Sequence, residues 1–274
     1  MPNLTAAPMM HSCTRRGGSI LKLHANDENV KFQDSPPKAQ PHGNPVIPRS
    51  GTEPAIITLP LECGSRFADK PKHGGARNRA DRVSEALTIA QVANLQAAVA
   101  HADKIGLPFT RMITIHWERT GLPLAMMAKA TGHYLDYLAK ALARHGSATA
   151  WAWVHENGPN KGGHAHILVY VPAYLVPMLT KLQRGWLRRI TGAPYRAKVI
   201  LSRPIGGRLG VEVASPDLHA INLAEALDYV LKGADIETHR QLDLQRQEPG
   251  GRIIGKRCGV SQNIGPKARA ARGR

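Results

Sequence analysis

Two apolar stretches joined by a short polar turn constrain this fold more than any other feature of the sequence. Residues 148–156 (ATAWAWVHE) and 164–171 (HAHILVYV) are rich in strand-forming residues, and the seven residues between them (NGPNKGG) favour turns. Strands joined by so few residues pair antiparallel, so the sequence predicts a β-hairpin here. Side chains two residues apart in such a strand lie on the same face of the sheet.

The other periodic segments predict helices and further strands around this hairpin. Apolar spacing and cap residues predict helices near 83–104, 120–146, 177–190 and 221–235, and β-branched runs predict strands at 55–63, 110–118, 195–202 and 209–214. This order predicts an α+β fold with a mainly antiparallel sheet and helices packed on it. The connections predict a split β-α-β topology, as in ferredoxin-like folds.

Composition divides the chain into three parts. Residues 1–82 are rich in Pro, Gly, Ser and Asn and lack a sustained period, which predicts a disordered or weakly ordered basic region. Residues 83–240 carry most of the periodic segments and form the predicted globular domain. Residues 241–274 are expected to be a basic tail, since residues 252–274 contain seven Lys or Arg and no Asp or Glu.

The charge of the chain favours a polyanionic partner. The formal net charge is +17 and the pI is about 10.2, and nucleic acid is the polyanion that such a protein most often neutralises. The sequence has no apolar run near the roughly 20 residues of a membrane-spanning helix. The three cysteines, Cys13, Cys63 and Cys258, are too far apart for a C-x-x-C zinc site or a disulfide framework. We therefore expect a cytoplasmic protein with no role at a membrane.

The predicted hairpin brings together a set of metal-binding residue types. His164 and His166 share one face of their strand, and the seven-residue turn places Glu156 opposite His164. Two imidazoles and one carboxylate suit Mn²⁺, Mg²⁺ or Co²⁺, although zinc also fits this set. A slip of the pairing by one residue would present His155 instead of Glu156. The alternative to a metal site is two polar histidines on a half-buried strand.

A second candidate group lies in the last predicted helix. Tyr229 and Lys232 form a Y-x-x-K pattern and share one helical face, away from the apolar side of that helix. A phenol beside an ammonium group suits attack by tyrosine on a phosphodiester, with the cation countering the charge of the phosphate. Tyr137 begins another Y-x-x-K on the helix between the first two strands, and remains the alternative.

Three segments in this order resemble the motifs of the HUH endonuclease superfamily, on the side of its rolling-circle replication initiator (Rep) proteins. Residues 112–117 (MITIHW) resemble the first motif, residues 164–169 (HAHILV) the histidine motif, and residues 229–233 (YVLKG) the tyrosine motif. The resemblance covers about residues 110–235. In that family the tyrosine of Rep proteins follows the histidine pair, which favours Tyr229 over Tyr137, and Glu156 lies where the third metal ligand is often found.

The resemblance implies a metal-dependent enzyme that nicks and rejoins single-stranded DNA through a 5′-phosphotyrosine intermediate. Its cofactor would be a divalent ion, Mg²⁺ or Mn²⁺. Its partners would be single-stranded DNA at a replication origin or element end, and a host helicase, since the sequence has no Walker-type glycine-rich loop. The host element would be a plasmid, phage or mobile element. A single-tyrosine transposase or relaxase, and a non-catalytic nucleic-acid-binding protein, are the alternatives.

Several other residues fit a role at DNA or a structural role. We expect Arg184, Arg188, Lys256 and Arg257 to be candidates for phosphate contacts, although arginines on a helix more often form its solvated face. His116 follows the first motif on the same strand face as Thr114 and is a candidate neighbour of the metal. Trp151 and Trp153 lie on the strand face opposite to Glu156, where core packing is expected and base stacking is the alternative.

Overall fold

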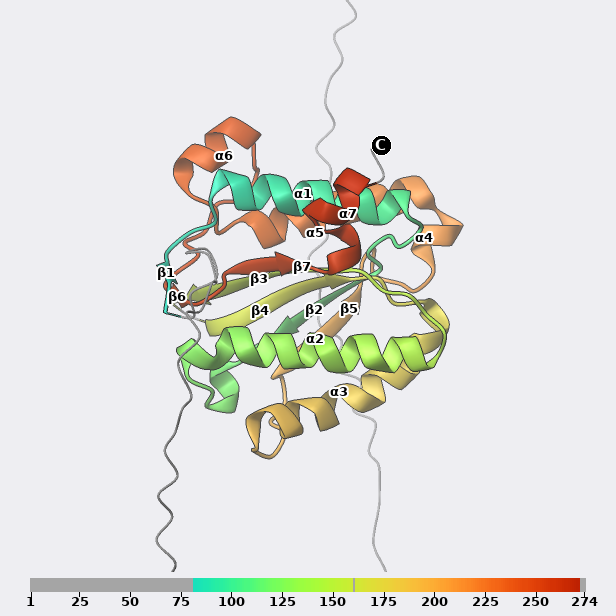
Figure 1. The fold of residues 1–274 in the computed structure, drawn as a ribbon, viewed down its shortest axis with the longest axis horizontal. Coiled ribbons are helices and arrows are strands. Elements are labelled where there is room, and N and C mark those ends of the chain that lie inside the picture. The colour runs from blue at the N-terminus through green and yellow to red at the C-terminus, as the bar shows by residue number, and fades with distance from the viewer. Residues whose placement is uncertain (1–80, 160, 272–274) are drawn as a thin grey trace, which may run out of the picture. The chain divides into compact units, whose positions relative to one another are not determined.

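The computed structural model describes residues 81–159 and 161–271 (Figure 1). The strand expected at 55–63 and almost all of the N-terminal region expected to be disordered lie outside these residues. Five strands form one antiparallel sheet in the order β5–β2–β4–β3–β7. They are β2 (Arg111–Ile115), β3 (Trp151–Gly158), β4 (Gly162–Val169), β5 (Ile200–Pro204) and β7 (Cys258–Val260). The predicted α+β class with an antiparallel sheet is confirmed.

Helices cover both faces of this sheet (Figure 1). On one face, called the α1–α5 face, lie α1 (Ile89–Lys104), α5 (Pro216–Leu231) and α7 (Pro266–Ala271). On the other, called the α2–α3 face, lie α2 (Met127–Arg144) and α3 (Val176–Thr191). Each face has its own apolar core, because strand side chains alternate: Trp153 and Ile167 enter the α2–α3 core, whereas Val154 and Leu168 enter the α1–α5 core. None of the helices in the described part of the chain is long and apolar enough to cross a membrane.

Proline and glycine signals in the sequence mark both ends of α3 and the end of α2. Pro177 lies in the first turn of α3, where its missing N–H costs nothing. Gly192 ends α3 in the left-handed conformation, with φ 68°, and Gly146 follows α2 with φ 69°. The smaller elements are β1 (Val83–Ser84), β6 (Ile253–Ile254), α4 (Val211–Ala214), α6 (Ile236–Leu242), η2 (Glu118–Thr120), η3 (Leu124–Met126), η4 (Ala173–Leu175) and η5 (Gln262–Ile264).

The strand predicted at 209–214 is wrong. Residues Val211–Ala214 form the short helix α4, which follows Gly210 in the left-handed conformation (φ 76°). Val211 is buried but Val213 is 81% exposed, so the alternating valines do not mark a buried sheet face. Other boundaries also differ from expectation. β5 begins at Ile200 rather than near residue 195, and α1 begins at Ile89 rather than near residue 83. α2 begins at Met127 rather than near residue 120, and α5 spans Pro216–Leu231 rather than 221–235.

The segment expected to be a basic tail supplies part of the sheet. β7 pairs antiparallel with β3, with Ala152 opposite Val260 and Val154 opposite Cys258. β6 pairs with β1 in a separate two-stranded ladder. The domain therefore extends beyond the boundary that composition placed at residue 240. Strands of two and three residues within a glycine- and arginine-rich segment have too few apolar positions to show a period.

Candidate functional site

The hairpin of β3 and β4 brings Glu156, His164 and His166 together on the α1–α5 face. Glu156 lies directly opposite His164 in the register, so the pairing favoured from the sequence is confirmed and the slipped pairing with His155 is wrong. His164 Nε2 and His166 Nε2 lie 3.4 and 3.6 Å from Glu156 Oε2. All three side chains are buried, and one ligand atom from each lies within 4.8 Å of the others. This geometry could hold a single metal ion.

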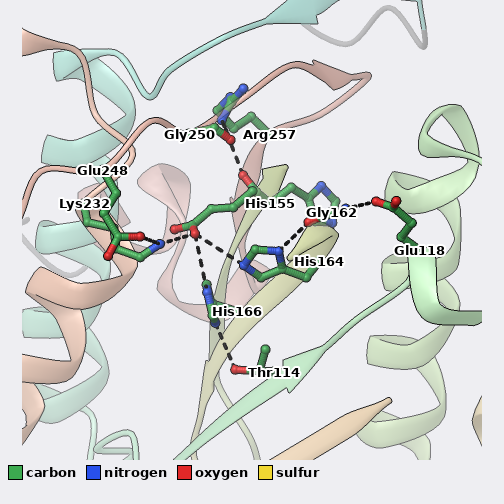
Figure 2. A network of polar contacts seen from close by, with 12 residues as sticks. Thr114, Glu118, His155, Gly162, His164, His166, Lys232, Glu248, Gly250 and Arg257 are labelled. Atoms are coloured by element: carbon green, nitrogen blue, oxygen red, sulfur yellow. Dashed lines mark hydrogen bonds and ion pairs between the residues drawn. The ribbon is translucent and has the colours of Figure 1, made fainter. Parts of the chain in front are cut away.

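Hydrogen bonds fix how each histidine faces the carboxylate (Figure 2). His164 Nδ1 lies 2.7 Å from the carbonyl oxygen of Gly162, and His166 Nδ1 lies 2.9 Å from Thr114 Oγ1. With Nδ1–H donating in both rings, each Nε2 carries a lone pair. Both Nε2 atoms and Glu156 Oε1 are buried and make no hydrogen bond within the described residues. Three unsatisfied acceptors around one point could coordinate a cation. A histidine that binds a metal through Nε2 usually donates its Nδ1–H to a protein acceptor, which fixes the orientation of the ring.

The electrostatics of the group favour the protonation states that bind a metal. Burial alone would raise the pKa of Glu156, but the contacts with His164 and His166 and the charge of Lys232 lower that pKa below its ordinary value. Burial lowers the pKa of His166, against the opposing effect of Glu156. The carboxyl group is therefore ionised and the His166 ring neutral near neutral pH, as metal ligands must be.

Lys232 lies against the same carboxylate. It follows the last residue of α5, is buried, and its Nζ donates to Glu156 Oε2. Its Nζ also lies 3.4 Å from Oε2 of Glu248, whose side chain is about half exposed (Figure 2). The backbone supports this position, because Glu248 N–H donates to the carbonyl oxygen of Lys232 at 2.9 Å. A buried ammonium between two carboxylates is paired rather than left as an isolated charge.

Tyr229 lies beside the histidines, on the last turn of α5. Its ring centroid is 5.1 Å from that of His166, with the rings nearly perpendicular. Two cations flank this half-buried ring: Lys232 Nζ lies 4.9 Å and the Arg246 guanidinium 5.8 Å from its centroid. The structure thus brings both residues of the Y-x-x-K pattern, on or next to α5, beside Glu156, His164 and His166 of the β3–β4 hairpin, which lies about 60 residues earlier in the chain.

Tyr137 is separated from these residues by the sheet. It lies on α2, packs against the core of the α2–α3 face, and stacks on Trp186 with ring centroids 6.2 Å apart. The geometry thus joins Tyr229 to the metal-binding group and leaves Tyr137 on the opposite face.

His116 is a neighbour of the group, and His155 is not. His116 is buried and its ring stacks on that of His164 with centroids 5.3 Å apart, as its strand face suggested. Burial and the nearby His164 lower the pKa of His116 to about 4, so its ring is neutral. His155 lies on the α2–α3 face, where its ring nitrogens lie 2.8 Å from Thr131 Oγ1 and 2.9 Å from the carbonyl oxygen of Lys256.

The surface cations expected to contact DNA do not gather at this group. Arg184 and Arg188 lie on α3, on the other side of the sheet, and the Arg184 guanidinium lies over the ring of Tyr195 at 5.3 Å. Lys256 is exposed, with its Nζ 5.6 Å from the ring centroid of Trp153. Trp153 is buried in the α2–α3 core and Trp151 packs against that core, which fits the expected packing role of both.

Arg257 contacts protein rather than solvent. Its side chain is buried, and its guanidinium donates to Ser84 Oγ at 2.9 Å and to carbonyl oxygens of Ser84, Gly251, Gly250 and His155. The expected phosphate contact by Arg257 does not fit this burial, since its donors already hold β1, the 250–251 loop and β3. The sequence places Arg257 in a basic segment, but it does not show that this side chain is buried against β1 and β3.

Sequence reasoning did not identify Thr114, Arg246 and Glu248 as part of the site. Thr114 lies one strand away from His166, opposite it in the register, and only the pairing of β2 with β4 reveals the contact. Arg246 and Glu248 lie in a segment after α6 that has no apolar period, so their position near Tyr229 and Lys232 depends on tertiary structure.

Comparisons with protein-family models, with curated proteins and with solved structures find no match to this chain.

Proposed function

We propose that the protein is a metal-dependent endonuclease of the HUH type that nicks and rejoins single-stranded DNA to initiate rolling-circle replication. One observation carries the proposal: a phenol, Tyr229, lies against His166 within a buried group of two imidazoles and a carboxylate. A nucleophile next to a metal-binding set is the arrangement that phosphodiester cleavage by tyrosine requires.

The order of the strands supports the same proposal. β2 and β3 both flank β4 and both run antiparallel to it, and α2 connects them along the chain. This is consistent with the split β-α-β topology expected of a ferredoxin-like HUH domain. The strand that carries both histidines, β4, is the middle strand of the sheet.

Each residue of the site would have a separate role in the cleavage reaction. Glu156, His164 and His166 would hold a divalent ion, Mg²⁺ or Mn²⁺, which supplies Lewis-acid polarisation of the scissile phosphate when bound. The Tyr229 oxygen attacks phosphorus and forms a new O–P bond, while the bond from phosphorus to the 3′ oxygen breaks. The phenolic proton ends on that oxygen, which leaves a 5′-phosphotyrosine and a free 3′-OH. Lys232 orients Glu156 and offsets negative charge beside the phosphate.

The substrate class follows from charge and chemistry together. A formal charge of +17 favours a polyanion, and a site that must expose one phosphate to a tyrosine favours an unpaired strand. The enzyme would act in the cytoplasm on a replication origin or element end of a plasmid, phage or mobile element. A host helicase would supply the unwinding.

A covalent adduct tests the proposal directly. The protein is incubated with a panel of single-stranded oligonucleotides and Mn²⁺ or Mg²⁺, and the products are separated on a denaturing gel. The expected result is a protein–DNA band that depends on the metal and is absent with duplex DNA. If every oligonucleotide is bound but none is cleaved or linked, the protein is a nucleic-acid-binding protein instead. Preference for hairpin-ended over origin-type strands would indicate a transposase.

A further inference from the structure

A pocket opens beside the metal-binding group, at the turn end of the β3–β4 hairpin. It has a volume of about 530 Å³, and its lining includes Glu118 and Arg119 of η2, Asn157 of β3, and Lys161 in the turn. Pockets that bind small groups or single residues of a polymer have this size. The pocket begins one residue after Glu156 along β3 and ends two residues before His164 along β4.

Glycines let η2 dock against the hairpin and form one wall of this pocket. Gly163 N–H donates to Glu118 Oε2 at 2.7 Å (Figure 2). Gly162 has φ 63°, and a Cβ on it would lie 1.7 Å from the same oxygen, so only glycine allows this approach. The Gly162 carbonyl oxygen is also the partner of His164 Nδ1. The wall of the pocket and the orientation of His164 therefore depend on the same residue.

The pocket carries two cations without acidic partners. Arg119 and Lys161 are both exposed, and within the described residues neither has a carboxylate in ion-pair distance. The carboxylate of Glu118 is already bound to the Gly163 amide. Arg119 donates to the carbonyl oxygen of Lys198 at 3.5 Å, a neutral partner that leaves its charge uncompensated. Two exposed cations without a carboxylate partner next to the candidate metal site indicate a second anion subsite.

We infer that Arg119 and Lys161 bind the backbone phosphate of the nucleotide next to the scissile phosphate, an inference that depends on the proposed DNA substrate. The Gly158–Gly162 pair lies two residues beyond the Glu156–His164 pair, about 7 Å at the rise of a β-strand. This distance is of the order of one nucleotide step in an extended strand. The guanidinium fork and the ammonium contact phosphate without reading the base, so this subsite positions the strand rather than selects its sequence.

The salt dependence of binding tests this inference without requiring cleavage. Arg119→Gln and Lys161→Gln, singly and together, are compared with wild type in binding a short fluorescent oligothymidylate without metal. Losing this one phosphate contact should reduce the slope of log K against log salt by about 0.7 in the double variant, and each single variant should lose part of that amount. The affinity of the double variant at low salt should fall by at least about tenfold.

A matched control removes the same charge elsewhere. Lys129→Gln with Arg144→Gln changes two exposed cations on α2, on the opposite face of the sheet, and should leave the slope near that of wild type. An unchanged slope in the pocket variant, or an equal fall in the control, overturns the inference. Circular dichroism verifies that each variant is folded.

The two proposals can fail separately. If wild type forms the covalent adduct but the pocket variant keeps its salt slope, the subsite is wrong and the endonuclease stands. If the slope falls as expected but no adduct forms on any strand, the pocket binds DNA and the endonuclease proposal is wrong.

Discussion

At the residue scale, the two histidines of the site are held by different kinds of partner. The backbone carbonyl oxygen of Gly162 accepts from His164 Nδ1–H, whereas His166 Nδ1 shares a hydrogen bond with the hydroxyl of Thr114. The backbone contact cannot be removed by substitution, but the hydroxyl can. Thr114 therefore offers a way to loosen one ligand without touching the ligands themselves.

Thr114→Val should weaken metal binding by about 10- to 100-fold, because the isosteric side chain leaves the His166 ring free to turn. Isothermal titration with Mn²⁺ measures the effect, and Glu156→Gln should lose more because it removes a charged ligand. Thr180→Val, which changes a threonine on α3 across the sheet, is the control and should bind as wild type does. Equal affinities for Thr114→Val and wild type would show that the hydroxyl does not hold the ligand.

Tyr229→Phe should abolish the covalent adduct while DNA affinity changes little, since the ring stays against His166 and only the nucleophilic oxygen is lost. Tyr137→Phe makes the same chemical change on the opposite face and should still form the adduct. Denaturing gels score both variants, and mass spectrometry of the wild-type adduct identifies the linked peptide. An adduct on residue 137 would place the nucleophile on the wrong side of the sheet for this site.

Cys258 offers a prediction about pH. Burial raises the pKa of its thiol from 9.0 to about 11, against the opposing charges of Lys256 and Arg257. The folded state binds the thiol proton more tightly than the unfolded chain does. The stabilisation that comes from this protonated thiol is therefore complete below pH 9 and is lost between about pH 9 and 11. With Cys13 and Cys63 replaced by serine, iodoacetamide should modify the native protein slowly at pH 8 and rapidly in urea. Fast native labelling would contradict the burial.

At the element scale, the turn end of the hairpin depends on close backbone contacts. Gly250 accepts from Asn157 N–H at 2.9 Å, and Gly251 has φ 67°, so the 250–251 loop lies directly on the end of β3. A Cβ on Gly251 would lie 1.9 Å from the carbonyl oxygen of Asn157. Because Asn157 adjoins Glu156, this contact also positions the carboxylate of the candidate metal site.

Gly251→Ala should destabilise the fold by about 3 kcal/mol or more, because both the left-handed backbone and the clash oppose it. Gly132→Ala is the matched control: this exposed position in α2 has no atom within 4 Å of the added Cβ, and the change should stabilise by roughly 1 kcal/mol. Urea unfolding midpoints measure both. A neutral Gly251→Ala would mean that the loop moves away from β3 at little cost.

The same elements show what local pattern can and cannot predict. The hairpin, its register and the helices α2, α3 and α5 follow from alternation, apolar spacing and caps, so Glu156, His164 and His166 could be placed together from the sequence. The helix α4 could not be told from a strand, because two valines in four residues fit both periods. β7 could not be found, because a three-residue strand forms only once β3 offers its edge.

At the scale of the whole molecule, one buried arginine forms hydrogen bonds with segments that lie far apart in the sequence. Arg257 joins β1, the 250–251 loop and β3 through the hydrogen bonds of a single guanidinium. Burial lowers the pKa of Arg257 to about 10, which still leaves the group charged near neutral pH. The contact between Tyr229 and His166 likewise depends on packing between distant segments, which no local pattern encodes.

Arg257→Met should lower the free energy of unfolding by about 3 kcal/mol or more, because several carbonyl acceptors lose a charged donor. It should leave the salt slope of DNA binding unchanged, in contrast to the phosphate contact expected from the sequence. Thermal unfolding and fluorescence anisotropy measure the two effects, with the exposed Arg252→Met as control. A stable variant with a reduced salt slope would restore Arg257 as a DNA contact.

The Arg257 contacts also fix the order of events during synthesis of the chain. Ser84 and Arg257 are 173 residues apart, and Asn94 and its partner Arg269 are 175 apart. At 5–20 residues per second, Ser84 waits about 9 to 35 s on the ribosome before Arg257 is made. Throughout that interval β3 lacks its outer neighbour β7. The 250–251 loop, which contacts Asn157, also lacks its hydrogen bonds from Arg257. The nascent chain therefore cannot complete the surroundings of Glu156, His164 and His166 until translation has passed residue 257, long after the two histidines have been made.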